Sequence, residues 1–270
     1  AGRYDDAYLV NWESNVFPGI LGRTCDRPCE PACRRGRVEE NNGEKPEPVA
    51  ICRLKRVTAD NKSDIRPRLP KKGAPNGRRI ACVGGGPASL AVARDLAPLG
   101  YHITVFDQDP KAGGFMRTQV PRFRLPESVI DEECGYILDL GVDFVGNRRI
   151  DSLKALLAEG YDAVFVGCGA PRGRDLELPG RQEAKANIHI GIDWLASVSF
   201  GHIDKIGRKV IVLGGGNTAM DCCRSSRRLG GTDVKVIVRS GFEEMKASPW
   251  EKEDAMHEGI PIMNFLVPKT

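Results

Sequence analysis

Short apolar runs alternate with glycine-rich turns and helical patterns through much of the chain. Residues 80–83 form an apolar run that leads directly into three glycines, and residues 88–96 show helical periodicity. A second apolar run at residues 103–106 ends at Asp107. Short apolar runs bounded by turn signals are typical of buried strands, and their alternation with helical patterns is typical of parallel βαβ units. The pattern therefore predicts a strand, a tight turn, a helix and a second strand over residues 80–107.

The same succession returns at residues 209–239. An apolar run at 210–213 precedes three glycines, helical periodicity covers 218–229, and a second apolar run covers 234–238. This second unit ends in Arg239 rather than in an acidic residue. Two such units predict an α/β fold with two Rossmann-like nucleotide-binding domains.

Weaker patterns predict the remaining elements. Residues 4–21 are interpreted as one short helix followed by a turn at Pro18 and Gly19. Further helices are predicted from periodicity and further strands from apolar runs: helices within 127–140, 150–159, 184–200 and 251–257, and strands at 141–145 and 161–166. Asp151 is the expected N-cap of the helix at 150–159.

Glycines in the first predicted turn have the spacing of a dinucleotide-binding motif. Gly84 permits the tight turn, and Gly86 lets the backbone approach a pyrophosphate at the N-terminus of the following helix. Asp107, at the end of the second strand, can accept hydrogen bonds from ribose hydroxyl groups. Ser89 occupies the third-glycine position, which predicts less close packing of helix on strand. A sharp glycine turn without a ligand is the alternative interpretation.

The second glycine turn has the same spacing but a different charge at its far end. Gly214 and Gly216 match the motif, and Ala219 occupies the third-glycine position. Arg239 stands where an acidic residue would face a ribose hydroxyl group, and arginine suits a 2′-phosphate. The first site is therefore predicted to bind a bare ribose and the second NADP, which suggests a flavin and a nicotinamide nucleotide in one chain. A solvated surface cation is the alternative for Arg239.

Cysteines gather near the start of the chain. Cys25, Cys29 and Cys33 follow one another at four-residue spacing, and Cys52 lies beyond a loop rich in Gly, Pro and Glu. Prolines among them disfavour a regular helix, so a wound loop is expected. Clustered thiolates on a loop suit an iron–sulfur cluster, which makes these four cysteines the candidate metal ligands. Structural zinc and unrelated structural cysteines are alternatives, but the chain has no C-x2-C pair of the kind typical of zinc.

Composition restricts the function classes without identifying one. The chain has 270 residues, and its net charge of +4 is too small to indicate a nucleic-acid partner. It lacks an apolar run of about 18 residues, so no membrane-spanning segment is predicted. The polar, acidic start does not resemble a signal peptide. Nine cysteines beside nucleotide motifs favour reduced thiols and metal ligands, and we expect a cytoplasmic protein.

Two further segments carry candidate ligand-binding residues. A turn at Gly113 and Gly114 follows the first unit, and the segment QVPRFRLP at residues 119–126 supplies Arg122, a cation able to reach a phosphate or acidic group. Gly169, in GCGAPRG, lies at the carboxyl end of a predicted parallel strand, where such sheets bind ligands. An exposed basic loop and structural turn glycines are the alternative interpretations.

These segments, in this order, resemble the glutamate synthase small-subunit family, which includes the flavin part of dihydropyrimidine dehydrogenase. The resemblance rests on GRTCDRPCEPAC, VGGGPASLAVARDLAPLGYHITVFD, the Gly113 and Gly114 turn, VPRFRLP, LGGGNTAMDCCRSSRRLGG and EEMKASPWEKEDAMHEGI, and it covers nearly the whole chain. It implies a cysteine-rich, mainly helical iron–sulfur segment that precedes the two nucleotide domains. It also implies FAD in the first domain, NADPH (or NADH) in the second, and electron transfer through 4Fe–4S clusters.

The resemblance further implies residue roles and a partner. By position, Gly84, Gly86 and Asp107 fall on the flavin motif, and Pro87, Ala88, Gly114, Arg122 and Gly169 are further candidate cofactor-binding residues. The expected NADPH-binding residues are Gly214, Gly216, Asn217, Thr218 and Arg239, and the expected cluster ligands are Cys25, Cys29 and Cys33. No side chain need act as nucleophile or acid, because the cofactors supply the chemistry. The expected partner is an electron-accepting subunit or domain, either the glutamate synthase large subunit or another redox enzyme such as a formate dehydrogenase or hydrogenase.

The expected domain division follows from these motifs. Residues 1–55 form the cysteine-rich segment, 56–78 a linker, 79–190 the FAD-binding domain and 191–270 the NAD(P)H-binding domain. The family's upstream cysteine set and its late glycine–aspartate motif are absent from these residues, so we expect them to be part of a longer polypeptide. Ser240 replaces a second family arginine, which keeps NADH open as the donor.

Two other function classes are considered. A non-catalytic assembly or electron-relay module would retain the fold and a cluster without a working flavin site. A disulfide enzyme resembling thioredoxin reductase would need a redox C-x2-C pair near the second glycine turn, and the chain has none.

Overall fold

The computed structural model describes residues 2–38 and 43–269, which fold into two compact units. The first unit comprises Ala1–Met116 and Phe123–Gly169, and the second comprises Arg117–Arg122 and Ala170–Thr270. Residues 170–190 thus belong with the second unit, whereas the sequence-based division places them in the flavin domain. A Cβ atom on Gly173 would lie 3.1 Å from the side chain of Ile192, which joins this segment to the second unit.

Two helices open the first unit. α1 (Tyr4–Ser14) and α2 (Pro18–Thr24) are separate, whereas the sequence predicted one helix followed by a turn at Pro18 and Gly19. That turn prediction was wrong, because Pro18 is the first residue of α2. Proline is favoured at a helix start, where its missing N–H costs no intrahelical hydrogen bond. Two cysteine-bearing segments then follow, and residues 25–33 form turns without a regular helix, as predicted.

The third helix, α3 (Ile51–Asn61), lies directly against α2. A Cβ atom on Gly22 would lie 2.7 Å from the backbone nitrogen of Arg56, so the two helices approach backbone to backbone. Residue 56 lies within α3, whereas the sequence-based division starts a linker at this residue. Short 3-10 turns at Arg34–Arg37 and Arg66–Arg68 lie on either side of α3 in the chain.

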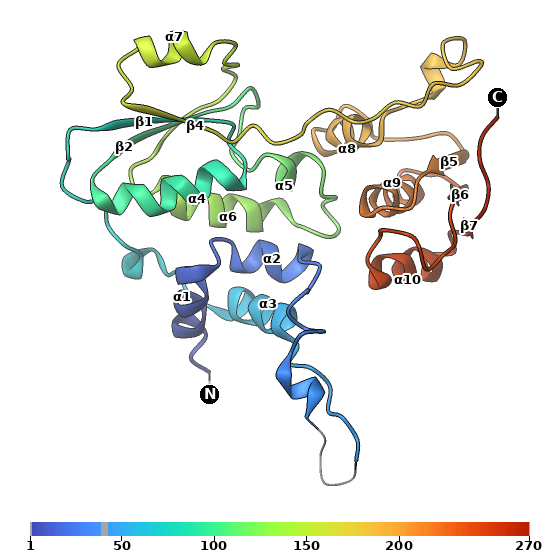
Figure 1. Cartoon of the computed structure of the whole chain (residues 1–270), viewed down its shortest axis with the longest axis horizontal. Helices are drawn as coiled ribbons and strands as arrows, with labels where there is room; N and C mark the ends of the chain where they lie inside the picture. Colours follow the sequence, from blue (N-terminus) through green and yellow to red (C-terminus); the bar gives the residue numbers. More distant parts are fainter. Residues whose placement is uncertain (1, 39–42, 270) are drawn as a thin grey trace. The chain divides into compact units, whose positions relative to one another are not determined.

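A four-stranded parallel sheet forms the core of the first unit, in the order β3-β2-β1-β4 (Figure 1). Its strands are β1 (Arg79–Val83), β2 (His102–Phe106), β3 (Asp143–Val145) and β4 (Ala163–Val166). All four coincide with predicted strands. Because the strands are parallel, their carboxyl ends share one edge of the sheet, and the first glycine turn leaves from that edge.

Helices cover both faces of this sheet. α4 (Pro87–Leu96), the short α5 (Phe115–Thr118) and α6 (Glu127–Leu138) lie on one side, and α7 (Leu153–Ala158) lies on the other (Figure 1). Leu156 of α7 is buried against sheet residues that include Phe106. The N-cap of α7 is Ser152, whose Oγ accepts a 3.2 Å hydrogen bond from the N–H of Ala155, so the predicted cap Asp151 was wrong.

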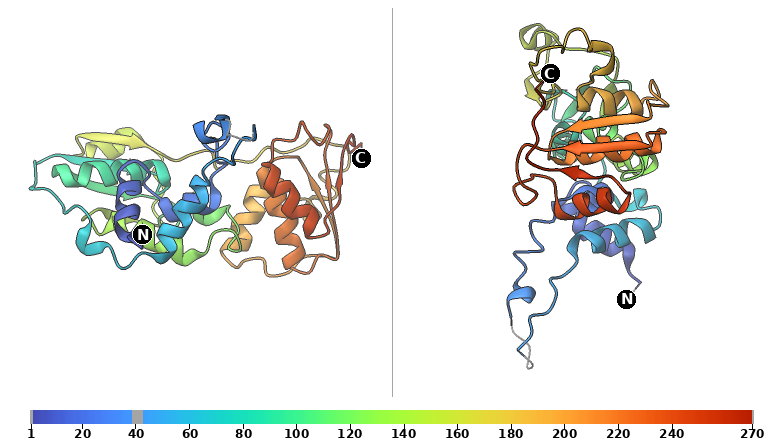
Figure 2. Two further views of the ribbon diagram at one scale, coloured as in Figure 1. Left: turned by 90° about the horizontal axis from the view of Figure 1, so that it is seen from below. Right: turned by 90° about the vertical axis from the view of Figure 1, so that its right-hand side faces the viewer.

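The second unit repeats this plan on a smaller scale. Its three parallel strands, β5 (Lys209–Leu213), β6 (Asp233–Ile237) and β7 (Ile262–Met263), lie side by side in the order β5-β6-β7 (Figure 2). Its helices are α8 (Gly191–Ser199), α9 (Asn217–Arg228) and α10 (Pro249–His257). The two parallel sheets with their helices confirm the α/β part of the fold prediction.

Apolar packing holds α9 and α10 on the second sheet. Met220 and Cys223 of α9, Val236 of β6 and Ala255 of α10 are all completely buried in one cluster. Burying such side chains removes apolar surface from water and stabilises the unit without directional bonds. The glycine turn before α9 is therefore attached to a rigid support.

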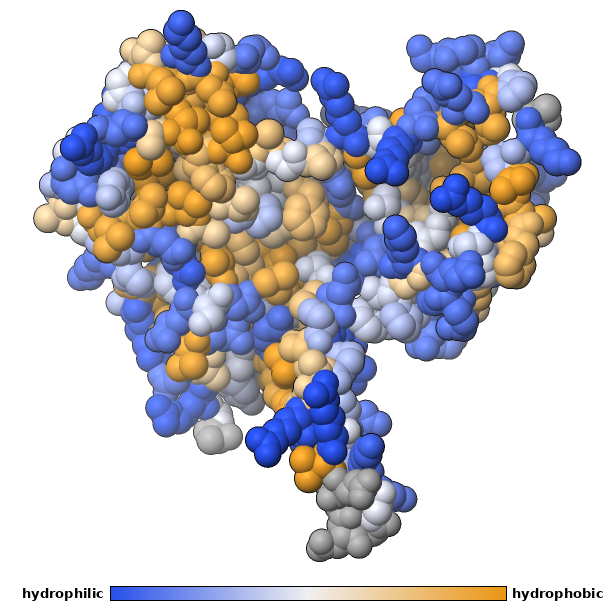
Figure 3. All heavy atoms as spheres, viewed as in Figure 1, coloured by the Kyte–Doolittle hydropathy of each residue, from blue (hydrophilic) through white to orange (hydrophobic). Residues whose placement is uncertain are grey.

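The surface of the described chain is mixed in polarity. Figure 3 shows apolar surface on the first unit near α7, whose Leu153 and Leu157 are exposed. Among the described residues, no helix combines the length and apolar character needed to cross a membrane.

Candidate functional site

The first glycine turn joins β1 to α4 at the carboxyl edge of the sheet. The N–H of Gly84 donates a 2.7 Å hydrogen bond to the carbonyl of Phe106, and Gly84 has a φ of +98°. A Cβ atom on Gly84 would lie 2.5 Å from the carbonyl oxygen of Gly167, so a larger residue does not fit. Gly86 is the N-cap of α4 and Pro87 its first residue. The first N–H groups of α4 have no intrahelical partners and form a site suited to phosphate.

A second pair of glycines packs onto this turn. The N–H of Gly113 donates a 2.8 Å hydrogen bond to the carbonyl of Gly85. A Cβ atom on Gly114, whose φ is +52°, would lie 2.7 Å from Cα of Gly86. Main chain therefore contacts main chain at the N-terminus of α4. This side-chain-free surface fits the pyrophosphate of a dinucleotide, which requires close backbone approach.

Asp107 lies directly after β2 and orients the first turn. Its carboxylate accepts hydrogen bonds from the N–H of Gly85 and, at 2.8 Å, from the N–H of Asp109. Burial, together with the nearby Asp107 charge, raises the pKa of Asp109. Each carboxylate oxygen retains a lone pair for a further donor. The contact of Asp107 with ribose hydroxyl groups stays a prediction.

Ser89, at the third-glycine position, is completely buried between α4 and the sheet. A Cβ atom on Gly167 would collide with its Oγ, so the small residue that close packing requires stands after β4 instead of on the helix. The sequence predicted less close packing because Ser89 replaces the usual third glycine, and it did not reveal that Gly167, distant in the chain, faces this serine. The contact shows how a serine is accommodated at this position.

The remaining cofactor-binding candidates of this part of the chain are dispersed. Ala88 is exposed in the first turn of α4, and Gly169 is exposed with a φ of +65° and open space beside it. Arg122 is half-buried in Arg117–Arg122, which belongs to the second unit. Their contacts with a cofactor stay predictions.

The second glycine turn is built like the first. The N–H of Gly214 donates a 3.0 Å hydrogen bond to the carbonyl at the end of β6, on Ile237, as Gly84 does to Phe106. The carbonyl of Gly215 accepts a 2.9 Å hydrogen bond from the N–H of Ala247, as Gly85 does from Gly113. Gly216 is the N-cap of α9, and a Cβ atom on it would enter open space. The room beside Gly216 fits a pyrophosphate.

Asn217 links this turn to the start of α10. Its Oδ1 accepts a 2.8 Å hydrogen bond from the N–H of Ser248, the N-cap residue of α10. Asn217, which was predicted to bind the nucleotide, therefore has a structural role in the described chain. Thr218, in contrast, is exposed and borders a pocket.

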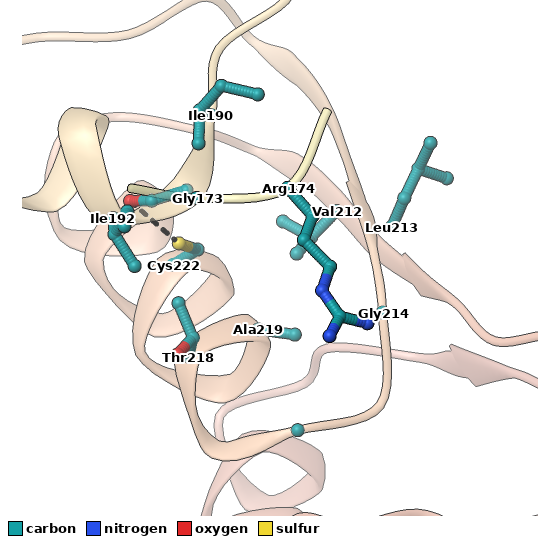
Figure 4. A pocket seen from close by; sticks show the side chains of 12 residues that line it. Gly173, Arg174, Ile190, Ile192, Val212, Leu213, Gly214, Thr218, Ala219 and Cys222 are labelled. Carbon is teal, nitrogen blue, oxygen red and sulfur yellow. Dashed lines mark hydrogen bonds between the residues drawn. The ribbon is translucent and has the colours of Figure 1, made fainter. Parts of the chain in front are cut away.

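That pocket, of about 240 Å³, lies over the second turn (Figure 4). It is lined by Gly173, Arg174, Ile190, Gly191, Ile192, Val212, Leu213, Gly214, Gly216, Thr218, Ala219 and Cys222. The Arg174 side chain points towards Gly214 and Ala219 (Figure 4). Sequence reasoning missed Arg174, although a basic residue in the loop after a parallel strand was the available signal. Arg239, which follows β6, is exposed and lies outside this lining.

The candidate cluster cysteines differ in their surroundings. Cys52 is 2% exposed, and its Sγ lies 3.5 Å from the carbonyl oxygen of Leu21 and 3.4 Å from that of Gly22. These contacts suit a protonated thiol, and burial raises the pKa of Cys52. A ligand thiolate at this position would face two carbonyl oxygens. The geometry of Cys52 therefore does not fit the predicted role of a metal ligand.

The other three cysteines are more accessible. Cys29 is exposed, Cys25 and Cys33 are half-buried, and Cys25 Sγ accepts a 3.4 Å hydrogen bond from the N–H of Arg27. Backbone hydrogen bonds from Val49 and Arg35 lower the pKa of Cys33, which favours its thiolate. Within the described part of the chain, no three Cys, His, Asp or Glu side chains are arranged to hold a metal ion. The candidate cluster cysteines are thus not arranged as a metal site in the described residues.

Two similarly built glycine turns, each between a parallel strand and a helix, define a protein with two dinucleotide-binding folds. The profile of the pyridine nucleotide-disulphide oxidoreductase family matches residues 78–265, and the chain belongs to this family. It is therefore an oxidoreductase with an FAD- and NADP-binding type of fold.

Curated relatives agree with this assignment. The beta subunit of the NADP(+)-dependent formate dehydrogenase of Moorella thermoacetica is 34% identical over 294 residues, which cover 100% of this chain and 40% of the relative. The small chain of NADPH glutamate synthase from Azospirillum brasilense is 32% identical over 284 residues, which cover 99% of this chain and 58% of the relative. The chain thus spans less than two thirds of either relative. The resemblance predicted from the motifs is confirmed.

A solved structure shares the fold. FprA of Mycobacterium tuberculosis in complex with NADPH aligns with a TM-score of 0.56 and 22% identity over 67% of this chain and 47% of FprA. This similarity shows the fold alone.

Proposed function

We propose that this chain is an electron-input module, which oxidises NAD(P)H with a bound FAD and passes the electrons to a partner redox subunit. The single observation that carries the proposal is the duplicated turn. Gly84 and Gly214 are each the first glycine of a motif. The N–H of each donates a hydrogen bond to the carbonyl at the end of the neighbouring strand. A chain that needed one nucleotide would not need the second turn with its own pocket.

The flavin is assigned to the first turn. The main-chain surface formed by Gly86 and Gly114 supports a pyrophosphate, and the carboxylate of Asp107 supports the turn and a bare ribose. The flavin, when bound, would take two electrons as hydride from the nicotinamide and release them to an acceptor. The chain itself would bind and orient the two nucleotides, which can supply a large part of a rate enhancement.

The nicotinamide nucleotide is assigned to the second turn. Gly216 leaves room for the pyrophosphate, and the exposed Arg239 after β6 can approach a 2′-phosphate. We therefore propose NADPH as the preferred donor, with NADH as the alternative that Ser240 keeps open. The proposed roles of Pro87, Ala88, Asn217 and Thr218 rest on their places in the first turns of α4 and α9, and that of Gly169 rests on its place after β4.

We propose that the electrons leave this chain for a partner redox subunit. Moorella formate dehydrogenase beta subunit and Azospirillum glutamate synthase small chain are named as parts of larger enzymes. A 4Fe–4S cluster held by Cys25, Cys29 and Cys33 would fit the sequence, but the described residues do not gather these thiols. No electron step is therefore assigned to a cluster of this chain. We infer a cytoplasmic location from the thiol content.

The decisive experiment is an absorption spectrum of the purified full chain before and after anaerobic NADPH, with NADH in a parallel sample. Flavin bands that bleach with either nucleotide would support the electron-input role. Iron and acid-labile sulfide, measured on the same sample, would test the cluster separately. A protein that binds no FAD, even when FAD is supplied in excess, would overturn the proposal and favour a non-catalytic assembly module.

A further inference from the structure

The pocket over the second glycine turn is lined by one positively charged side chain that does not belong to the dinucleotide motif. Of the described residues that line this pocket, Arg174 alone carries a charge. Its side chain reaches towards Gly214 and Ala219, at the start of the motif and in the first turn of α9 (Figure 4). In a Rossmann fold this is the place of the pyrophosphate, whereas the 2′-position of the ribose lies by the end of the second strand.

The charge of Arg174 is available to a ligand. No carboxylate within the described ranges lies at salt-bridge distance from its guanidinium group. The adjacent acidic residue, Asp175, is instead paired with Arg181 through hydrogen bonds of 3.1 Å to both carboxylate oxygens. The two opposite charges next to one another in the chain therefore point to different partners, and only Arg174 borders the pocket.

The rest of the pocket is neutral and held in place. Sγ of Cys222 on α9 lies 3.6 Å from the carbonyl oxygen of Gly191, which ties the start of α8 to α9. Burial raises the pKa of Cys222, so its thiol stays protonated. The N-terminus of a helix alone offers an anion only a partial positive charge. A pyrophosphate with two negative charges therefore gains most from the single guanidinium group.

We propose that Arg174 binds the pyrophosphate of the nicotinamide nucleotide at the second turn. This inference rests on the proposed function and deepens it. It assigns the two arginines different phosphates: Arg174 contacts the group that NADH and NADPH share, and Arg239 contacts the 2′-phosphate that only NADPH has. Arginine is suited to either role because its planar fork matches phosphate oxygens.

The test is a binding titration on the full chain kept in excess FAD, so that the first turn is occupied. NADPH, NADH, ADP-ribose and 2′-AMP are titrated into wild type, Arg174→Ala, Arg174→Lys and the neighbouring control Arg172→Ala. We expect Arg174→Ala to raise the Kd of NADPH, NADH and ADP-ribose alike, by about tenfold, because a charge-assisted hydrogen bond is lost. Binding of 2′-AMP, which lacks a pyrophosphate, should not change. Arg172→Ala should bind all four as wild type does, and Arg174→Lys should retain part of the affinity.

The outcomes separate the inference from the proposed function. Equal Kd values for wild type and Arg174→Ala, with unchanged thermal unfolding, would overturn the role of Arg174 and leave the function standing. A loss confined to NADPH would place Arg174 at the 2′-phosphate and overturn the pyrophosphate assignment. A wild-type protein that binds neither NADPH nor NADH would overturn the proposed function, and the inference with it.

Discussion

The hydroxyl group of Tyr8 donates a 2.6 Å hydrogen bond to Oε1 of Glu133, although the two residues lie 125 positions apart. The same carboxylate accepts hydrogen bonds from the N–H groups of Gly19, at 2.6 Å, and Ile20, at 2.9 Å. Glu133 is 1% exposed. One buried side chain on α6 therefore fastens both α1 and α2, and with them the start of the cysteine-rich segment, to the flavin-type fold.

Stability of this junction should depend on pH through Glu133. Burial raises the pKa of Glu133 from 4.5 to about 7, against the opposing effect of its three hydrogen bonds. A carboxyl group whose pKa is raised by folding stabilises the fold fully below pH 4.5, and this contribution is lost as the pH rises through 7. We expect the free energy of unfolding to fall by up to about 3 kcal/mol between pH 4.5 and 8 from this group. Urea unfolding at several pH values measures it.

Glu133→Gln is the matched variant, because the amide keeps the size but cannot titrate. It should lower stability overall, since its NH2 group would face the N–H of Ile20 where a carboxylate oxygen stands in wild type. Its unfolding free energy should nevertheless vary less with pH than that of wild type. The same pH slope in both proteins would contradict the role of Glu133.

Flavin retention should depend on Gly114. Its φ is +52°, and a Cβ atom would lie 2.7 Å from Cα of Gly86, where main chain cannot move aside as a flexible side chain can. Gly114→Ala is expected to reduce FAD affinity by at least about tenfold, because left-handed strain of about 1–2 kcal/mol adds to the collision. The absorbance ratio of flavin to protein after gel filtration measures the loss.

Gly180→Ala is the control for backbone strain without collision. Gly180 has a φ of +80°, and a Cβ atom on it would meet no other atom within 4 Å. This variant should lose a little stability and retain its flavin. If both variants lose flavin equally, the close approach of Gly114 and Gly86 is not what shapes the site.

The sequence predicted what depends on short spacing. Gly84, Gly86, Gly214 and Gly216 lie in the turns that their spacing indicated, because a glycine turn is decided by neighbouring residues. All strands of the first sheet were likewise found. The start of α2 at Pro18 was missed, because proline permits either a turn or a helix start and only packing decides between them.

Contacts between distant segments were not predictable in this way. Ser89 fits at its position because Gly167 faces it, and Glu133 has its partners more than a hundred positions away. Arg174 approaches Gly214 only after the loop that carries it packs onto the second unit. A single sequence shows which residue types are present, but it does not show which distant residues contact one another.

The ion pairs of Arg224 should be important for stability of the second unit. Arg224 on α9 is buried and bonds to Glu251 at 2.9 Å, Asp254 at 3.0 Å and Glu258 at 2.9 Å, all from α10 or its end. Arg224→Ala would remove the buried ion pair with Glu251, and breaking a buried pair from one side costs about 3–5 kcal/mol. Denaturant unfolding measures the change.

Arg228→Ala serves as the comparison for Arg224. Arg228 also bonds to Glu258, at 2.6 Å, but its side chain is 42% exposed. An exposed pair contributes about 0–1 kcal/mol, so this variant should unfold nearly as wild type does. Similar losses in both variants would mean that burial of Arg224 is not decisive.

Donor preference should depend on Arg239. The residue is exposed just after β6, where a 2′-phosphate would be placed by the fold. Arg239→Ala is expected to raise the Kd for NADPH by about tenfold and to leave that for NADH nearly unchanged, because only NADPH has the third phosphate. Stopped-flow reduction of the flavin at varied nucleotide concentration gives both values. An equal loss for the two donors would remove the 2′-phosphate role.

Thiol reactivity should separate Cys33 from Cys52. Backbone hydrogen bonds lower the pKa of Cys33, whereas Cys52 is 2% exposed and its pKa is raised by burial. Alkylating reagents attack the thiolate, so Cys33 should be labelled by iodoacetamide at least about tenfold faster at pH 7.5 in reduced, chelator-treated protein. Peptide mass spectrometry over a time course gives both rates.

Because a metal ligand must also be a thiolate, Cys52→Ala should leave the iron content of the untreated protein unchanged, whereas Cys33→Ala should lower it if these thiols hold a cluster. Fast labelling of Cys52, or iron lost with its removal, would return it to the set of ligands.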